Sequence, residues 1–239
     1  MTEWLCGRHA VEEALAGSAR DVLEILVRKG VREAVGDRIE KQAREQGVSI
    51  GVAEREAFDE MGFDGAAVAA RCSSFRYRGE HDLPPGDGDR LVVVLDSIQD
   101  PQNLGAIIRT AEVVGADALC IAARRAAQVT PAVVRASAGA TEHLPIHRVG
   151  NLARLIGRLR KTGYWSVGLA PEGGEAWDQV DYRGPIALVV GAEGAGLRRL
   201  VAHECDHLVA LPVRGKVDSL NASAAFAAVA FEVRRQRGV

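Results

Sequence analysis

Three blocks of this sequence place polar side chains shortly after a run of apolar residues. In the first, Asn103 and Arg109 follow the apolar run 91–95. In the second, a glycine-rich turn that contains Glu193 follows the apolar run 186–190. An amide, a guanidinium and a carboxylate can bind and orient a polar substrate through hydrogen bonds and charge. These side chains are therefore candidates for a catalytic site.

The third block adds both apolar and polar candidates. An apolar run ends at Leu211, and Ser219, Leu220 and Asn221 follow a glycine-containing loop at the expected start of the last helix. Glycines let backbone amides approach a ligand closely, and apolar side chains can line a ligand pocket. Taken singly, the same residues also fit ordinary structural roles: the leucines in the core, the glycine in a turn and the polar residues as helix caps.

The elements that carry these blocks alternate along the chain. Apolar runs of strand length alternate with helical patterns from residue 91 onward. The expected strands are 91–95, 118–122, 165–169, 186–190 and 208–211. Such alternation predicts an α/β fold with a mostly parallel sheet covered by helices. Open α/β folds bind ligands at strand–loop–helix junctions like those of the three blocks.

The composition divides the chain into three parts. Residues 1–76 alternate between helical and strand patterns and are expected to form a small α/β domain of their own. Residues 77–89 are polar and rich in Pro and Gly, which is typical of a linker. Residues 90–239 contain the three blocks and form the expected catalytic domain.

The overall charge does not indicate a nucleic-acid-binding protein, although a local cluster can bind one. The 239 residues include 30 Lys and Arg against 32 Asp and Glu, a formal net charge of −2. The best local candidates are arginines interleaved with aromatic residues, a combination that suits phosphates and bases. They are Arg71, Phe75, Arg76, Tyr77 and Arg78.

The sequence also gives indications of the cellular location of the protein. It has no apolar run of about 18 residues, so no membrane-spanning helix is expected. Its four cysteines are scattered without a CxxC pair, which is typical of reduced thiols. The first residues are neither basic nor followed by an apolar signal core. We therefore expect a cytoplasmic protein.

Together, the three blocks resemble the three motifs of the SpoU (TrmH/RlmB-type) RNA 2′-O-ribose methyltransferases of the SPOUT superfamily. The likeness runs over roughly 150 residues in the same order and spacing, and Gly7-Arg8-His9 resembles the opening of the RlmB-like subgroup. The resemblance implies a catalytic domain with a deep trefoil knot. It also implies an N-terminal RNA-binding domain similar to a ribosomal protein, although Phe63-Asp64-Gly65 stands where relatives usually carry His-Gln-Gly.

The resemblance also assigns a cofactor and site residues. It implies S-adenosylmethionine as the methyl donor, bound by Gly191, Leu211 and Leu220. The positions that match the catalytic residues of relatives are Asn103, Arg109, Glu193, Ser219 and Asn221. The expected reaction is methylation of a guanosine ribose in 23S ribosomal RNA, with a tRNA guanosine as the alternative.

Two of these catalytic roles need a physical argument. Arg109 matches the arginine that is proposed to act in relatives as the base for the 2′-hydroxyl. A guanidinium, however, hardly ever loses its proton in proteins. Orienting the target phosphate and stabilising the developing alkoxide is physically easier for Arg109. Glu193 is expected to orient either Arg109 or the RNA.

Other functional classes stay open at this stage. The chain could be a ribosome-assembly RNA-binding protein with an inactive catalytic domain. His203-Glu-Cys-Asp-His207 satisfies the HExxH pattern of zinc peptidases, but that motif needs one helix, and the strand at 208–211 predicts that the helix ends before His207. No metal is therefore expected. The run 191–196 is not GxGxxG and has no P-loop lysine, which argues against NAD or ATP.

The last helix bears on the oligomeric state. Residues 222–231 are apolar almost all round, more than one face of a modest domain usually requires. A helix buried on both sides and a helix in a dimer contact explain this pattern equally well. Relatives are obligate dimers, so the resemblance favours a homodimer with Phe226 or Phe231 as an anchor.

Overall fold

The computed structural model describes the chain except residues 1, 32–35, 64, 171–172, 217–218 and 239. By their contacts, the residues form two compact units. Unit 1 contains residues 1–76 together with 129–143, and unit 2 contains residues 77–128 and 144–239. The segment 129–143, which lies within the expected catalytic part of the sequence, therefore packs with unit 1.

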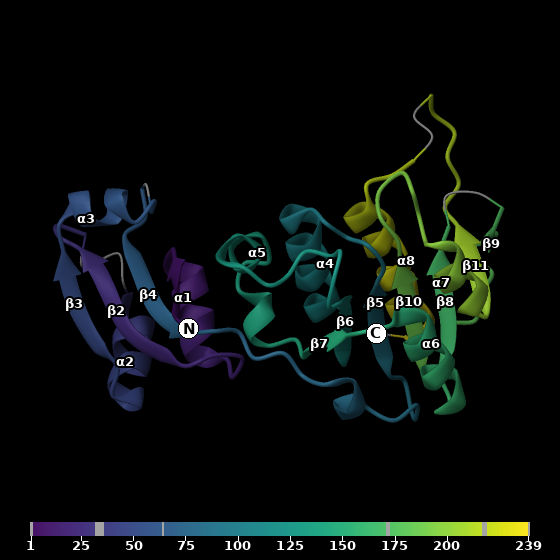
Figure 1. The fold of residues 1–239 in the computed structure, drawn as a ribbon, viewed down its shortest axis with the longest axis horizontal. Coiled ribbons are helices and arrows are strands. Elements are labelled where there is room, and N and C mark those ends of the chain that lie inside the picture. Colours follow the sequence, from purple (N-terminus) through teal and green to yellow (C-terminus); the bar gives the residue numbers. More distant parts are fainter. Residues whose placement is uncertain (1, 32–35, 64, 171–172, 217–218, 239) are drawn as a thin grey trace. The chain divides into compact units, whose positions relative to one another are not determined.

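Unit 1 is a four-stranded sheet with helices, in the strand order β1-β4-β2-β3 (Figure 1). β2 and β3 are parallel, and the pairs β1–β4 and β2–β4 are antiparallel. Its strands are β1 (Thr2–Cys6), β2 (Val22–Arg28), β3 (Ser49–Ala53) and β4 (Val68–Ser73). Its helices are α1 (Arg8–Ala16), α2 (Gly36–Gln46), α3 (Arg55–Glu60) and α5 (Pro131–Ala136), with the 3₁₀ turn η3 (Ala140–Glu142).

A buried ion pair fixes the segment 129–143 within unit 1. Arg20 Nε lies 3.1 Å from each carboxylate oxygen of Glu142, and both side chains are fully buried. The Arg20 guanidinium also contacts Glu3 at 2.5 Å and lies over the ring of Phe75. Burial raises the pKa of the Glu142 carboxyl, and the charge of Arg20 opposes that effect. Removal of Arg20 would leave the Glu142 carboxyl buried without its partner.

Unit 2 is built on a seven-stranded sheet in the order β7-β6-β5-β10-β8-β11-β9. Its strands are β5 (Leu91–Leu95), β6 (Ala118–Ala122), β7 (Ile146–Val149), β8 (Trp165–Leu169), β9 (Glu175–Ala176), β10 (Ile186–Val190) and β11 (His207–Ala210). Its helices are α4 (Pro101–Val113), α6 (Leu152–Lys161), α7 (Arg199–Glu204) and α8 (Ala222–Gln236), with the 3₁₀ turn η2 (Glu80–Asp82).

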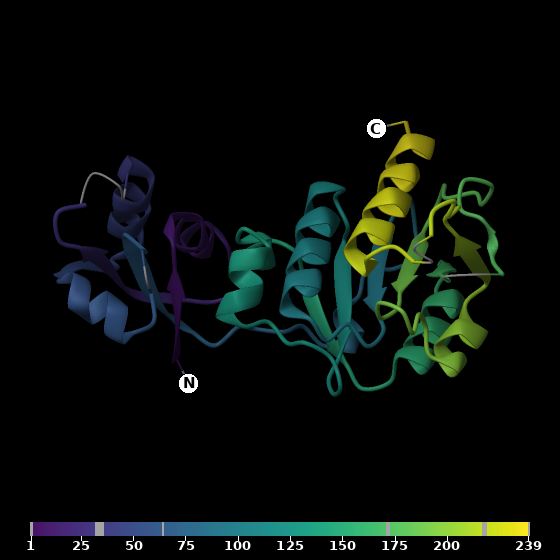
Figure 2. The same cartoon turned by 90° about the horizontal axis from the view of Figure 1, so that it is seen from above.

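All neighbouring strands of this sheet are parallel, which confirms the predicted α/β fold. Helices α4 and α8 pack against each other on one face, and α6 and α7 on the other (Figure 2). β5 and β10, which lie side by side in the middle, are buried along their whole length. Because the strands run the same way, their carboxyl ends share one edge of the sheet. The trefoil knot stays a prediction from the resemblance.

The Pro/Gly-rich segment 77–89, expected to be a linker, is part of unit 2 and contacts the rest of that unit. The backbone N–H of Arg78 donates to the carbonyl of Ile146 at 2.9 Å, and His147 Nδ1 lies 2.7 Å from the Gly79 carbonyl oxygen. The Tyr164 hydroxyl donates to the carbonyl of Pro84 at 3.1 Å. No helix in the described part of the chain has the length and apolar character needed to cross a membrane.

Candidate active site

The first helix of the site, α4, starts at the loop that follows β5. The Asp100 carboxylate accepts hydrogen bonds from the backbone N–H groups of Gln102 and Asn103, and Pro101 occupies the first helical position. Both features are favourable at a helix N-terminus. Asp100 therefore caps α4, and Asn103, whose residue type also suits a helix cap, lies in the first turn instead. The Asn103 side chain is left to make other contacts.

Three of the predicted catalytic residues form one hydrogen-bonded cluster. The Asn221 side-chain amide donates to Asn103 Oδ1 at 2.8 Å and to Glu193 Oε2 at 3.1 Å. The Asn103 amide also donates to Glu193 Oε2, at 3.3 Å. The side-chain oxygen Oδ1 of Asn221 accepts from the backbone N–H of Ser223 at 2.9 Å, so Asn221 caps α8. One side chain from each sequence block thus meets at the carboxyl edge of the sheet.

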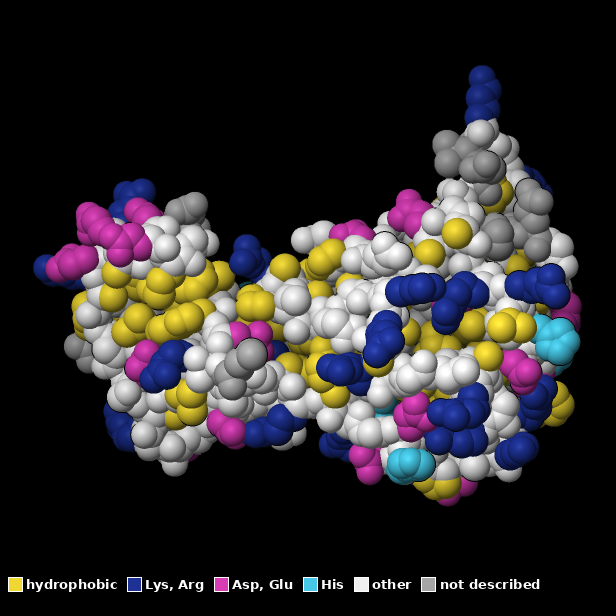
Figure 3. Space-filling view, in the orientation of Figure 1, with side chains coloured by type: hydrophobic (Ala, Val, Ile, Leu, Met, Phe, Trp, Pro, Cys, Tyr) yellow, Lys and Arg dark blue, Asp and Glu magenta, His cyan; other side chains and the backbone are white. Residues whose placement is uncertain are grey.

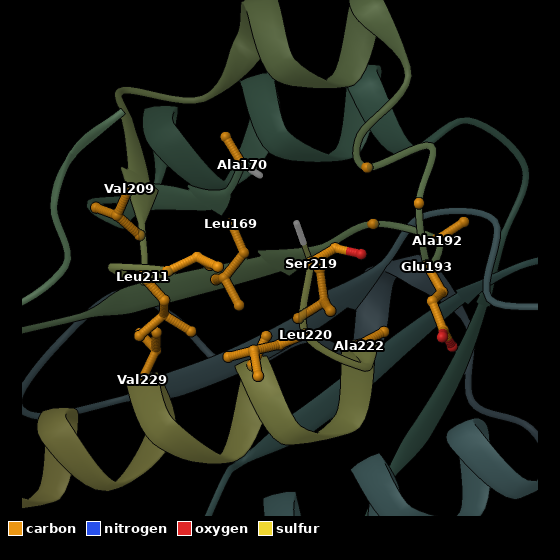
Figure 4. A pocket seen from close by; sticks show the side chains of 16 residues that line it. Leu169, Ala170, Ala192, Glu193, Val209, Leu211, Ser219, Leu220, Ala222 and Val229 are labelled. Atoms are coloured by element: carbon orange, nitrogen blue, oxygen red, sulfur yellow. The ribbon is translucent and has the colours of Figure 1, made fainter. Parts of the chain in front are cut away.

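A cavity lies directly beside this cluster. Its lining includes Gly191, Leu211 and Leu220, the three predicted cofactor residues, and also Glu193 and Ser219. In Figure 4 the leucines lie on the apolar side of the cavity, and the Ser219 hydroxyl points toward the turn that carries Glu193. Leu220 is 49% exposed, so it is not a core residue. The cavity combines an apolar wall with a polar margin, which suits an adenosine-containing ligand.

The lining also includes residues that the sequence analysis did not single out. Leu169 ends β8, Val209 lies in β11 and Val229 lies in the middle of α8. Sequence reasoning treats such side chains as core because they lie in apolar runs. Only the strand order brings the ends of β8 and β11 next to the turn after β10.

The glycine-rich turn after β10 is closed by its own backbone. The N–H of Ala192 donates to the carbonyl of Gly196 at 3.1 Å, and the N–H of Gly196 donates back to Ala192 at 2.8 Å. A Cβ atom at Gly191 would overlap the carbonyl group of Gly196 and lie 2.5 Å from the backbone nitrogen of Leu197. Gly194 and Gly196 have φ values of 72° and 64°, which favour glycine. The glycines are therefore needed for the turn itself.

A buried carboxylate fixes the end of this turn to β5. Asp96, fully buried at the end of β5, accepts from the backbone N–H of Arg198 at 2.8 Å and from Arg198 Nε at 2.6 Å. The two residues are 102 positions apart in the chain. Sequence reasoning missed this pair. A charged residue directly after a fully apolar strand is often buried, and a buried charge needs a partner of opposite charge, so a partner for Asp96 could have been sought. The pair ties the turn to the loop that leads into α4.

We expect Arg198→Ala to destabilise the protein. The substitution leaves the Asp96 carboxylate buried without its guanidinium partner, which should lower the free energy of unfolding by about 2 kcal/mol. Urea unfolding monitored by circular dichroism measures this change. Arg183→Ala is the matched control, because Arg183 pairs with Asp181 on the surface, and the loss of an exposed ion pair should change the free energy of unfolding little. Equal losses in the two variants would contradict the prediction.

Arg109 is separate from the cluster. Its side chain is exposed, and no hydrogen bond or ion pair joins it to another described residue. Glu193 therefore contacts the two asparagines and does not orient Arg109 within one chain. Arg109 and Val113 lie four residues apart on the same face of α4. The guanidinium is left available for a ligand or a second chain.

The HExxH match does not have the geometry of a zinc peptidase. α7 ends at Glu204, and His207 begins β11, as predicted. Burial raises the pKa of the Cys205 thiol between them to about 12. Within the described ranges, the structure has no group of three or more His, Cys, Asp or Glu side chains that could hold a metal ion.

The arginines predicted to contact nucleic acid in unit 1 already have partners. Arg71 Nε lies 2.9 Å from Glu24, and Arg76 Nη1 lies 2.7 Å from Asp21. Phe75 lies under Arg20, as described above, and Tyr77 of unit 2 lies under the Arg148 guanidinium. Part of the Phe63-Asp64-Gly65 segment, Asp64, lies outside the described residues. Because both guanidinium groups are already paired with carboxylates, Arg71 and Arg76 are less available to bind phosphates than the sequence suggests.

Comparison with known proteins agrees with this geometry. Residues 90–231 match the model of the SpoU rRNA Methylase family, and residues 4–78 match the family described as RNA 2′-O ribose methyltransferase substrate binding. The chain belongs to the SpoU rRNA methylase family. The family match covers all three blocks, and the second match covers the N-terminal part.

Individual relatives resemble the whole chain. It is 39% identical to the 23S rRNA (guanosine-2′-O-)-methyltransferase RlmB of Xanthomonas campestris pv. campestris, over 98% of this chain and 97% of the relative. It is 36% identical to the putative TrmH family tRNA/rRNA methyltransferase YacO of Bacillus subtilis, over 98% and 96%. The SpoU methyltransferase AviRb from Streptomyces viridochromogenes, solved in complex with AdoMet, has a TM-score of 0.82 at 26% identity, over 99% and 90%.

Proposed function

We propose that this SpoU family member transfers a methyl group from S-adenosylmethionine to the ribose 2′-hydroxyl of a guanosine in 23S rRNA. The observation that carries the proposal is the meeting of Asn103, Glu193 and Asn221 beside the cavity lined by Gly191, Leu211 and Leu220. The similarity to RlmB over nearly the whole chain supports the choice of substrate.

Each residue has a role that its position supports. The cofactor supplies an electrophilic methyl group, and Gly191, Leu211 and Leu220 would hold its adenosine part in the cavity. The two asparagines fix the Glu193 carboxylate at the polar margin, where it can orient the RNA. Ser219 lines the same margin with its hydroxyl. Arg109 orients the target phosphate and stabilises the developing alkoxide, because a guanidinium is a poor base.

Incubation with labelled S-adenosylmethionine and an unmodified 23S rRNA transcript tests the proposal. We expect label to enter the RNA, and mass spectrometry of the digested RNA to find it as 2′-O-methylguanosine. A tRNA transcript in a parallel reaction tests the alternative substrate. Binding of the 23S transcript without methylation of either RNA would favour the ribosome-assembly protein over the enzyme.

We further propose that the chain forms a homodimer through α4 and α8. Phe226 is fully buried in its own chain, so it is not an anchor, whereas Phe231 is 55% exposed. On α4, Val113 is 61% exposed. Each of these two residues lies ten positions after an asparagine of the Asn103–Asn221 hydrogen bond, so they lie at similar heights on the paired helices. Exposed apolar side chains on both helices, together with the resemblance to dimeric relatives, support a protein contact next to Arg109.

Light scattering should report about twice the 25.5 kDa chain mass at micromolar concentration. Phe231→Asp should shift the mass toward the monomer, because a carboxylate is costly in an apolar contact. Leu200→Asp is the control, since Leu200 is 72% exposed on α7, which lies on the opposite face of the sheet. A monomeric wild type that methylates RNA would refute the dimer and leave the catalytic proposal intact.

A further inference from the structure

The arginines of unit 2 differ in their pairing according to the edge of the sheet at which they lie. At the amino edge, Arg90 pairs with Asp117 at 2.7 Å and Arg183 with Asp181 at 2.8 Å. Arg160, near the end of α6, pairs with Glu204 at 2.8 Å. These arginines are neutralised by neighbouring carboxylates.

At the carboxyl edge, most of the arginines are unpaired. Arg124 and Arg125 follow β6, Arg154 lies in the first turn of α6, and Arg199 begins α7. All four are exposed, and none has a side-chain hydrogen bond or ion pair with another described residue. Arg198, which pairs with Asp96, is the exception. The edge that carries the candidate active site therefore presents four unpaired guanidinium groups, with the carboxylates of Asp100 and Glu193 at the same edge. The chain as a whole has a formal net charge of −2.

The space-filling view agrees with an uneven charge distribution. On the face of unit 2 that it displays, Lys and Arg side chains gather in several groups, with smaller Asp and Glu groups between them, and the largest Asp and Glu group lies at the α3 end of unit 1 (Figure 3). An anionic polymer would meet more positive charge on unit 2 than the overall composition suggests.

Arg124 and Arg125 lie on a loop that the structure holds in place. The N–H of Ala127 donates to the carbonyl of Ile98 at 2.8 Å, which joins this loop to the loop after β5. The Gln128 side-chain amide donates to three carbonyls of the same segment, those of Ala122, Ala126 and Ala127. The loop is therefore closed on itself and fixed beside the segment that leads to Asn103 and Arg109.

The backbone of this loop is strained at an arginine. Arg125 has a φ of 59°, and Ser97, on the loop joined to it, has a φ of 64°. Residues other than glycine rarely adopt this left-handed conformation, and it persists where the surrounding structure enforces it, often at functional sites. Glycine would adopt this conformation more easily than arginine, so position 125 is a candidate functional position.

We propose that Arg124 and Arg125 bind backbone phosphates of the substrate RNA beside the active site. The proposal rests on the proposed function, because it takes RNA as the substrate. Planar guanidinium groups bind phosphate oxygens in a bidentate way, and such contacts position a nucleic acid without reading its sequence. Arg154 and Arg199 continue the same unpaired edge beyond the loop.

The test separates the guanidinium from the loop backbone. Arg125→Gly removes the charge and accepts the left-handed conformation without strain, and Arg125→Lys keeps the charge but loses the planar fork. The double variant Arg124→Ala with Arg125→Gly is compared with Lys161→Ala, which removes an exposed cation at the end of α6, away from this edge. Binding to a fluorescent RNA hairpin is measured over a range of KCl concentrations, together with S-adenosylmethionine binding and the KM for the 23S transcript.

We expect the double variant to bind the hairpin about tenfold or more weakly, with a shallower salt dependence, because two phosphate contacts are lost. Its KM for the transcript should rise, while S-adenosylmethionine binding and thermal stability stay at the wild-type level. Lys161→Ala should bind RNA normally, and Arg125→Lys should lie between Arg125→Gly and the wild type.

Wild-type RNA affinity and salt dependence in the double variant would overturn the proposal, and so would a wild type that does not bind the hairpin. Failure of the proposed function gives a different result. In that case the wild type transfers no methyl group, while the hairpin comparison still decides whether the two arginines bind RNA.

Discussion

Arg109→Ala is expected to lower the rate of RNA methylation by about 100-fold or more, while the affinity for S-adenosylmethionine stays nearly unchanged. Arg109 is not part of the cavity lining and has no partner among the described residues, so its loss should leave the cofactor site intact. The expected loss has the size found when a donor to a developing oxyanion is removed. Single-turnover methylation of the 23S transcript and calorimetry with S-adenosylmethionine measure the two effects separately.

The Arg109→Lys variant tests whether the planar guanidinium group or only the positive charge is needed. A lysine keeps the positive charge but cannot bind a phosphate in a bidentate way, so this variant should also be badly impaired. Glu112→Gln serves as a control on the same helix, because Glu112 is exposed and carries none of the proposed roles. Substantial activity in Arg109→Ala would refute the assignment of this residue.

Gly191→Val is expected to weaken S-adenosylmethionine binding by about 100-fold or more. The overlap with the backbone of Gly196 and Leu197 begins at Cβ, so the turn must open to admit any side chain. Opening the turn also moves Glu193, which contacts both asparagines. Calorimetry with S-adenosylmethionine measures the loss.

A smaller substitution at the same position identifies the cause. Because Cβ itself makes the clash, Gly191→Ala should be nearly as damaging as Gly191→Val. Gly150→Ala is the control, since a Cβ there meets no atom closer than 3.9 Å and the φ value is not positive. If the alanine variant binds normally and only the valine variant fails, the ligand and not the turn excludes the side chain. Normal binding by both variants would refute the placement of the cofactor.

Several local features could be predicted because local residues determine them. The apolar run 91–95 forms β5 with the expected bounds. Asn151 caps α6 by accepting from the backbone N–H of Arg154 at 3.1 Å. Gly115, with a φ of 69°, follows the end of α4 as expected of a C′ glycine. In each case the side chain and the backbone group that it serves lie within a few residues of each other.

At the start of α4, two residues of a type that suits a helix cap lie close together in the sequence. Asp100 and Asn103 both suit a helix N-terminus, and they are only three positions apart. The proline at position 101 favours the first turn of a helix, so a cap at Asp100 could have been inferred from the sequence. Asn103 then lies inside the first turn, and its amide contacts Glu193 and Asn221 instead.

By itself the sequence determined five strands of the larger sheet and the three blocks of candidate residues, because hydrophobic period, turn residues and motif spacing are properties of the chain. It did not indicate the short strands β7 and β9. The tertiary structure alone decided which side chains meet. Asn103 and Asn221 are 118 positions apart, and Asp96 and Arg198 are 102 apart. Their contacts exist because β5 and β10 lie side by side and all the strands end at one edge. The tertiary structure also decided which side chains of α8 are buried. Phe226 is fully buried and Phe231 is exposed, although both are phenylalanines on the same helix, because the difference depends on the elements that pack against α8.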